Sequence, residues 1–370
     1  MRPKSDCIAC LVERTKYECD LAFSSSENER EKISALREVL AFLVEHLGEE
    51  GRSPAFFGTE RERIIKRRSS ASGGARDIHA EVKRRSNEVA RGLLPVARKF
   101  YEAAASGAGE RAERGRASKR AERGRASKRA ERGGAGKIEA LVRIAAAANS
   151  MEYGVKGHSY DDAVFKEEFV QTVNERLNWA REEVVSALEG RERILYLTDN
   201  AGEVFFDAFV VKELVEEFGK AEVVVSPKST PVLNDATTKD LKEAFACVGV
   251  GESKGERVPE GEGGVPEGEG GVPEGEGEGW RGRVRVVPSG SCIGVSLEEA
   301  GAEFLEVFSD ERYLVVAKGM GNYESISEFE AKPELRLRGR GRLLYIFRAK
   351  CEPIASSVGV KRGELVAKLV

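Results

Sequence analysis

The sequence is poor in several residue types and lacks any long apolar run. It contains a single glutamine, Gln171, with three histidines, three methionines and two tryptophans among 370 residues. No apolar stretch approaches the roughly 18 to 20 residues that cross a bilayer, and the N-terminus lacks the apolar core of a signal peptide. We therefore expect a cytoplasmic protein with no membrane partner.

An excess of charge of one sign is also absent. The 60 basic and 63 acidic residues give a net charge of −3. This near-balance gives no global reason to expect nucleic acid as a partner. Charged residues nevertheless make up 33% of the chain, while glutamine is almost missing. Such a composition is typical of a thermophile, because ion-pair networks gain value at high temperature.

Two low-complexity inserts interrupt the chain. The first, placed at 110–136, repeats AERGRASKR and is basic; the second, placed at 252–279, repeats VPEGEGG and is acidic. Neither offers apolar residues to bury, so neither can join a core. We expect the acidic insert to be a mobile loop at the amino end of the sheet described next.

Hydrophobic periodicity changes near residue 190. Apolar residues recur at three- and four-residue spacing before it, which predicts a helical domain over 1–190. After it, short apolar runs separated at first by helical stretches predict a mainly parallel sheet in a doubly wound α/β domain over 191–370. The predicted strands are 194–198, 221–226, 283–288, 313–317 and 343–348, and the predicted helices between them are 203–218, 237–246 and 296–308.

Acidic side chains follow two of the predicted strands. Asp199 and Asn200 stand in TDNAGE, and Asp235 stands in PVLNDAT. Because ligands of open α/β sheets bind beyond the carboxyl ends of the strands, these oxygens are candidates to share a hard divalent cation. Taken alone, Asp199 would equally suit a helix N-cap. Lys318 follows another strand, where its charge suits a phosphate.

These segments together resemble the damage-control phosphatases, which are domain-of-unknown-function family 89. The agreement covers the N-terminal Cys-x-x-Cys, NSMEYGVKGH, TDNAGE, PVLNDAT, PSGS, AKGMGNYE and AKCEPIASSVGVKRGELV. It spans nearly the whole chain outside the two inserts. The resemblance implies an N-terminal helical domain packed on a Rossmann-like α/β/α domain.

The resemblance also implies an activity and its residues. The activity is divalent-metal-dependent hydrolysis of phosphate monoesters of small metabolites, sugar phosphates or related damaged metabolites. The metal, manganese, magnesium, cobalt or nickel, would be held by Asp199, Asn200 and Asp235, and Lys318 would contact the phosphate. Whether water or a carboxylate attacks stays open. The residues expected to contact substrate are Asn149, Gly202, Glu203, Ser289, Gly321 and Asn322.

Other signals leave alternatives open. Cys7 and Cys10 form a Cys-x-x-Cys without a second such pair, so we expect reduced thiols, with zinc or a redox pair as alternatives. His158 lies in the GVKGH stretch and is a lesser candidate for the site. A Rossmann-like domain also suits an S-adenosylmethionine-dependent carboxyl methyltransferase, and the basic repeat suits a non-catalytic nucleic-acid-binding protein. The oligomeric state is left open.

Overall fold

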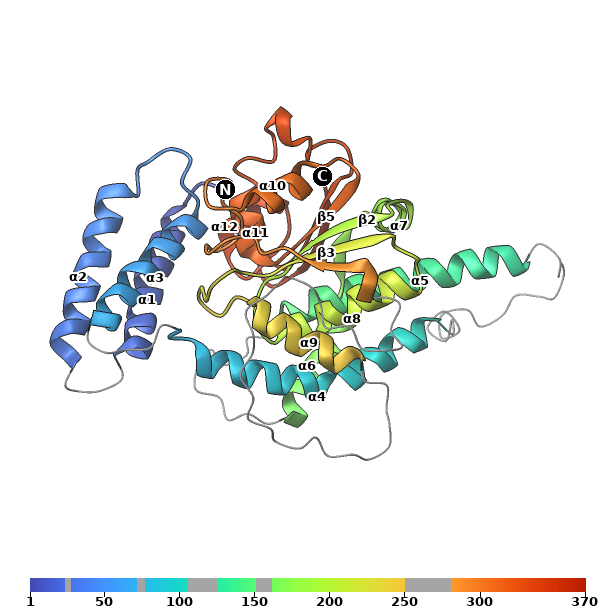
Figure 1. The fold of residues 1–370 in the computed structure, drawn as a ribbon, viewed down its shortest axis with the longest axis horizontal. Helices are drawn as coiled ribbons and strands as arrows, with labels where there is room; N and C mark the ends of the chain where they lie inside the picture. Colours follow the sequence, from blue (N-terminus) through green and yellow to red (C-terminus); the bar gives the residue numbers. More distant parts are fainter. Residues whose placement is uncertain (24–27, 72–76, 106–124, 151–161, 250–280) are drawn as a thin grey trace.

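A computed structural model describes residues 1–23, 28–71, 77–105, 125–150, 162–249 and 281–370 (Figure 1). The acidic insert, most of the basic repeat and His158 lie outside the described residues, so the predictions made for them stay predictions. Within the described ranges, no helix is both long and apolar enough to cross a membrane.

In the described part of the chain, seven strands form one sheet. They are β1 (Leu177–Trp179), β2 (Arg193–Leu197), β3 (Glu222–Ser226), β4 (Val284–Val286), β5 (Tyr313–Lys318), β6 (Leu343–Arg348) and β7 (Leu365–Leu369). Their order in space is β1-β7-β6-β5-β2-β3-β4. The strands from β6 to β4 run parallel, whereas β7 is antiparallel to β6 and pairs in parallel with β1.

Helices cover both faces of this sheet. Alternate residues of a strand point to opposite faces, so Ile194 and Tyr196 join one core while Leu195 and Leu197 join the other. The elements of the first core include α4 (Ala80–Ala105), α5 (Arg125–Ala148), α6 (Asp162–Val173), α7 (Arg181–Gly190), α8 (Glu203–Glu216) and α9 (Thr238–Gly249). The second face carries α10 (Ala302–Ser309), α11 (Gly319–Ile326) and α12 (Glu352–Val358). The predicted α/β fold class is confirmed.

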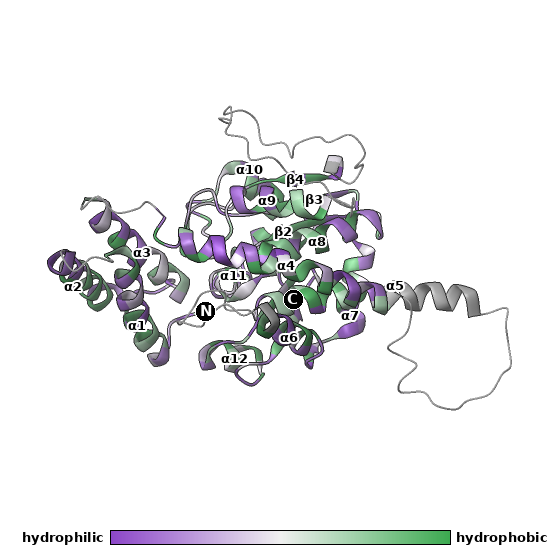
Figure 2. Ribbon diagram, turned by 90° about the horizontal axis from the view of Figure 1, so that it is seen from below, coloured by the Kyte–Doolittle hydropathy of each residue, from purple (hydrophilic) through white to green (hydrophobic). Residues whose placement is uncertain are grey.

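The N-terminal helices α1 (Ser5–Ala22), α2 (Glu29–His46) and α3 (Pro54–Ala71) form a separate bundle. Its own core contains Leu11, Val39, Phe57 and Ile65, none of which belongs to the two cores of the sheet. Figure 2 shows this bundle set to one side of the apolar strands β2 and β3. The cavity described below lies where the bundle meets the sheet domain.

Helices from both sides of the expected boundary at residue 190 pack on the sheet. The amphipathic helices α4 and α5 bury Leu93 and Leu141 in the same core as Val223 of the sheet, and β1 forms an outer strand. Periodicity identifies the apolar face of a helix but not the surface that covers it, which is why the sequence placed these helices with α1–α3. The helix predicted over 296–308 also begins later, at Ala302, since Gly301 before it is extended.

A candidate metal centre in a cavity at the sheet edge

Two loops at the carboxyl edge of the sheet are joined by backbone hydrogen bonds. The loop after β2 carries Asp199 and Asn200, and the loop after β3 carries Asp235. The Ala236 N–H donates to the carbonyl of Asp199 at 2.8 Å, and Asn200 pairs with Asp235 in an isolated antiparallel bridge. The structure therefore brings together the three side chains that the sequence predicts as metal ligands.

The Asp199 carboxylate is held from several sides. It accepts hydrogen bonds from the side-chain amides of Asn149 at 2.8 Å and Asn200 at 2.9 Å. On a further side it lies against Gly319, where a Cβ atom would stand 1.9 Å from an Asp199 oxygen. Gly319 has φ +81°, which also favours glycine. The strand-end turn before α11 thus leaves room for this carboxylate.

The two aspartates share an unfavourable electrostatic environment. Burial, together with the nearby carboxylates of Glu203 and Asp235, raises the pKa of Asp199 well above its ordinary value. Burial likewise raises the pKa of Asp235 to about 7, although Lys228 and Lys83 oppose the shift. Buried carboxylates that lack a neutralising partner are the environment that a bound cation relieves.

The donor set fits a hard divalent cation. Two carboxylates and one amide oxygen are ligands that Mg²⁺ and Mn²⁺ accept, with water filling the remaining positions. Among the residues that the structure describes, Lys228 is the cation that pairs with the Asp235 side chain, at 3.9 Å. In the described ranges no three His, Cys, Asp or Glu side chains converge as a ready metal site. The predicted set therefore depends on the amide oxygen of Asn200.

A buried network lies directly behind these ligands. Glu203, at the first turn of α8, accepts hydrogen bonds from Asn149 at 3.1 Å and Asn200 at 2.7 Å. Lys318 is fully buried, and its ammonium lies 2.9 Å from Asp207 and 3.5 Å from Glu203. Tyr196 donates a further hydrogen bond to Asp207. The ammonium of Lys318 thus faces this network, and its predicted phosphate contact stays a prediction.

Three other predicted substrate residues have local partners of their own. The N–H of Gly202 donates to Asn87 at 2.8 Å, so that helix start faces α4. Ser289 is buried and accepts a hydrogen bond from Lys228. Asn322 donates to the carbonyls of Thr198 and Lys318, which holds the ends of β2 and β5 together. None of the three lines the cavity.

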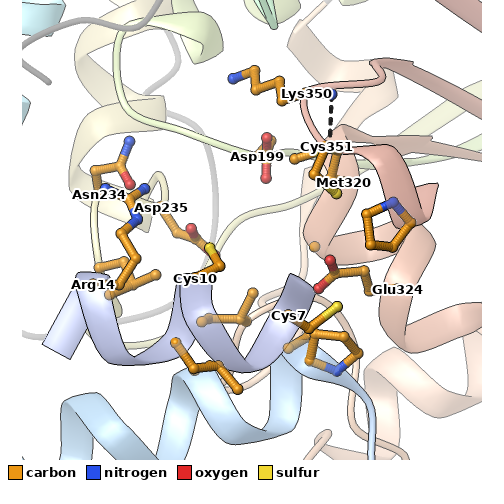
Figure 3. Close-up of a pocket in the computed structure, with 18 of the residues that line it drawn as sticks. Cys7, Cys10, Arg14, Asp199, Asn234, Asp235, Met320, Glu324, Lys350 and Cys351 are labelled. Atoms are coloured by element: carbon orange, nitrogen blue, oxygen red, sulfur yellow. Dashed lines mark hydrogen bonds between the residues drawn. The ribbon is translucent and has the colours of Figure 1, made fainter. Parts of the chain in front are cut away.

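A cavity of about 280 Å³ opens in front of the carboxylates. Of the predicted site residues, those that line it are Asn149, Asp199, Asn200, Asp235 and Gly321. Its other walls come from α1, α3, the 289–295 loop, α11 and the start of α12. Figure 3 shows Arg14 and Cys10 reaching from α1 toward the loop that carries Asn234 and Asp235.

Lys350 is a cation at this cavity that the sequence analysis did not select. It follows β6, and its N–H donates to the sulfur of Met320 at 3.3 Å (Figure 3). It is the leading positive charge that opposes the raised pKa of Asp199. Among the described residues, its ammonium makes no hydrogen bond or ion pair. The sequence feature that could have identified Lys350 as a site residue is its place in AKCEP, which follows a strand at the same edge of the sheet.

Three thiols also reach the cavity. Cys7 and Cys10 come from the first turns of α1, and Cys351 precedes α12. All six cysteines are free. Burial raises the pKa of Cys7 and raises that of Cys351 to about 11, so both thiols are protonated near neutral pH. Burial also raises the pKa of Glu324, which stands beside Cys7, to about 7.

The fold and the site together define a class of protein. It is a Rossmann-like α/β protein with a carboxylate-lined cavity at the edge of its sheet. Comparison with known proteins gives the family. The family model for the damage-control phosphatase ARMT1-like domain matches residues 4–366, and the chain belongs to this family. The family predicted from the sequence motifs is thereby confirmed.

Individual relatives agree with this assignment. A damage-control phosphatase from Archaeoglobus fulgidus is 28% identical over 98% of each chain. A Pyrococcus horikoshii protein, also named a damage-control phosphatase, is 30% identical over 62% of this chain and 63% of its own length. The crystal structure of a Pyrococcus horikoshii protein of domain-of-unknown-function family 89 matches with a TM-score of 0.70 at 21% identity, covering 100% of this chain and 99% of that one. The relatives' names support a phosphatase role.

Proposed function

We propose that this protein is a cytoplasmic, divalent-metal-dependent phosphatase that hydrolyses phosphate monoesters of small metabolites. The observation that carries the proposal is the pair of carboxylates, the half-buried Asp199 and the buried Asp235, which line one cavity from two loops joined by backbone hydrogen bonds. The family resemblance adds sugar phosphates and related damaged metabolites as the first substrates to test. Manganese, magnesium, cobalt and nickel are the metals to test.

The metal would be held by Asp199, Asn200 and Asp235. When bound, it supplies charge neutralisation and Lewis acidity at a phosphate oxygen. Asn149 orients the Asp199 carboxylate through a 2.8 Å hydrogen bond and is itself fixed by the N–H of Arg348 at 3.0 Å. Lys350 faces the cavity and is the described cation best placed to hold a second phosphate oxygen.

The bundle α1–α3 shields one side of the site from solvent. It forms the wall opposite the carboxylates, through Leu11 of α1 and through Ala55 and Gly58 of α3. A dry cavity strengthens the attraction between a phosphate and the charges around it. The leaving alcohol would lie between this wall and the metal ligands.

The test is phosphate release by the full chain after chelator treatment. Sugar phosphates and other small monoesters are supplied with Mn²⁺, Mg²⁺, Co²⁺ or Ni²⁺. We expect metal to restore turnover, Asp235→Asn to lower it at least about 100-fold, and the control Asp310→Asn, which changes an aspartate paired with Arg312, to leave it unchanged. Metal-independent turnover, or turnover that survives Asp235→Asn, contradicts the proposal.

A further inference from the structure

The cavity has two chemically different walls. The metal ligands and Lys350 form one wall. The other is built largely from carbon and sulfur, with the charged side chains Asp6, Arg14, Arg61 and Glu324 among them, and its apolar residues are Cys7, Cys10, Leu11, Pro54, Ala55, Gly58, Ile293, Met320, Cys351 and Pro353. No aromatic, serine, threonine or histidine side chain is among the described residues that line the cavity. A polyol would therefore find few neutral hydrogen-bonding partners on this second wall.

Ile293 is the most tightly fixed part of that wall. Its N–H donates to Thr59 of α3 at 2.9 Å. Its side chain fits between two glycines, because a Cβ atom on Gly58 or on Gly321 would stand 2.8 Å from an Ile293 methyl carbon. The following residue, Gly294, has φ +69° and would place a Cβ 2.2 Å from the Ser325 hydroxyl. The turn that carries Ile293 is thus wedged between α3 and α11.

The charged side chains of this second wall are Asp6, Arg14, Arg61 and Glu324. Arg61 is buried, and its Nε and Nη2 groups form a two-point ion pair with Glu18. Arg14 and Glu324 stand on opposite sides of the cavity (Figure 3). A ligand hydroxyl that lies against the Ile293 side chain would be removed from water without gaining a hydrogen bond from that side chain, which is unfavourable.

We propose that the cavity takes phosphate monoesters whose organic group presents apolar carbon to Ile293, and that Ile293 is the specificity-determining residue. This inference rests on the phosphatase function proposed above and narrows its substrate class. A rigid apolar surface favours apolar ligands over hydroxylated ones, because it offers a ligand hydroxyl no hydrogen bond. Because the surface is preformed, it needs no rearrangement before a ligand binds. A polyhydroxylated monoester of the same length is the disfavoured competitor.

The test compares two four-carbon substrates, n-butyl phosphate and erythritol 4-phosphate, with metal-loaded full-length protein. We expect kcat/KM to be at least about tenfold higher for the butyl ester, although its alcohol is the poorer leaving group. Ile293→Ala should reduce this preference to within about threefold by raising KM for the butyl ester, and Ile293→Val should restore most of it. Ile33→Ala, at a residue on α2 that is 49% exposed, is the matched control and should leave the preference unchanged.

The outcomes separate the two proposals. Turnover of both esters with equal or better use of erythritol 4-phosphate overturns the apolar-substrate inference and leaves the phosphatase intact. A butyl preference that Ile293→Ala does not alter, in a folded variant, overturns the role of Ile293. Absence of metal-dependent phosphate release from either ester, and from the wider panel, overturns the phosphatase function itself.

Discussion

At the scale of single residues, Asp235 carries an electrostatic cost that Lys228, 3.9 Å away, offsets only in part. Its pKa is about 7 in the folded protein, above the ordinary value of 3.8. A raised pKa means that the folded state favours the protonated form, so this contribution to stability is lost as pH rises from about 4 through 7. Metal binding should recover the loss, and metal should therefore raise the thermal midpoint more at pH 8 than at pH 5.

The same reasoning predicts the behaviour of Asp235→Asn. Asparagine resembles the protonated aspartate, so the metal-free variant should be more stable than the metal-free parent at pH 8 by about 1 to 3 kcal/mol. The difference should vanish near pH 4. Thermal or urea unfolding of chelator-treated protein at both pH values measures it. A variant that is less stable than the parent at pH 8 would contradict the raised pKa.

Lys318 and Lys350 offer a second comparison between residues. Lys318→Met would leave the buried carboxylate of Asp207 without its cation, and should cost about 3 to 5 kcal/mol of stability. Lys350→Met removes a cation that has no described partner, so the thermal midpoint should hold while kcat/KM for phosphate release falls about 100-fold. Unfolding and kinetics of both variants decide between these roles. If Lys318→Met lost activity without losing stability, the result would indicate that Lys318, and not Lys350, contacts the phosphate.

The residues also show how far the sequence could define the site. Asp199, Asn200 and Asp235 could be predicted to meet because strand-end loops of a parallel sheet share one edge. The direction of the Lys318 side chain could not be predicted, since it depends on Asp207, a carboxylate within the apolar stretch 204–211 of α8. Lys350 stood in a strand-end loop as well, but nothing in the sequence separated it from a surface lysine.

At the scale of elements, α3 holds the loop that carries Asp235. Glu62 is buried and accepts the N–H of Leu233 at 2.7 Å, and Lys66 donates to the carbonyl of Pro231 at 2.6 Å. Leu233 has φ +44°, an uncommon conformation for a residue other than glycine. The loop is therefore kept in place by a helix of the neighbouring bundle.

Removing this anchor should weaken metal binding without removing a ligand. Glu62→Ala frees the Leu233 N–H, and we expect metal affinity to fall about 10-fold to 100-fold. Glu60→Ala, two residues earlier on α3 at a carboxylate paired with Arg63, serves as the control and should bind metal normally. Calorimetric titration of each variant with Mn²⁺ measures the change. Equal affinity in the two variants would mean that the loop holds its shape alone.

The sequence analysis missed the strands β1 and β7, and it left the helices α11 and α12 unpredicted. β1 has three residues, too few for any period to register. β7 follows β6 and the helix α12, but it runs antiparallel to β6, so it departs from the parallel order of β2–β6 that the sequence predicted. The five strands predicted for the sheet correspond to β2–β6. In β2, β3, β5 and β6 the signal for a strand is a buried run of five or six residues, and in β4 it is a brief apolar run before PSGS.

At the scale of the whole molecule, the cavity joins units that pack separately. The bundle α1–α3 has its own small core, and smaller cores open more readily than the large ones on the sheet. Hydrogen exchange should therefore be faster in α1 and α3 than in β2 and β5. Mn²⁺ with inorganic phosphate should slow exchange at 7–14 and 54–62. If exchange at 7–14 and 54–62 stayed unchanged when Mn²⁺ and phosphate were added, the result would contradict a ligand cavity between the bundle α1–α3 and the sheet domain.

The separate packing of α1–α3 has an evolutionary consequence. The carboxylates belong to the sheet domain, whereas much of the wall that faces the organic group of a substrate belongs to the bundle. Substitutions at Leu11 or Ala55 can therefore reshape the ligand space without touching the loops that hold Asp199 and Asp235. Such an arrangement lets descendants of one ancestral chain acquire new substrates while inheriting the reaction unchanged.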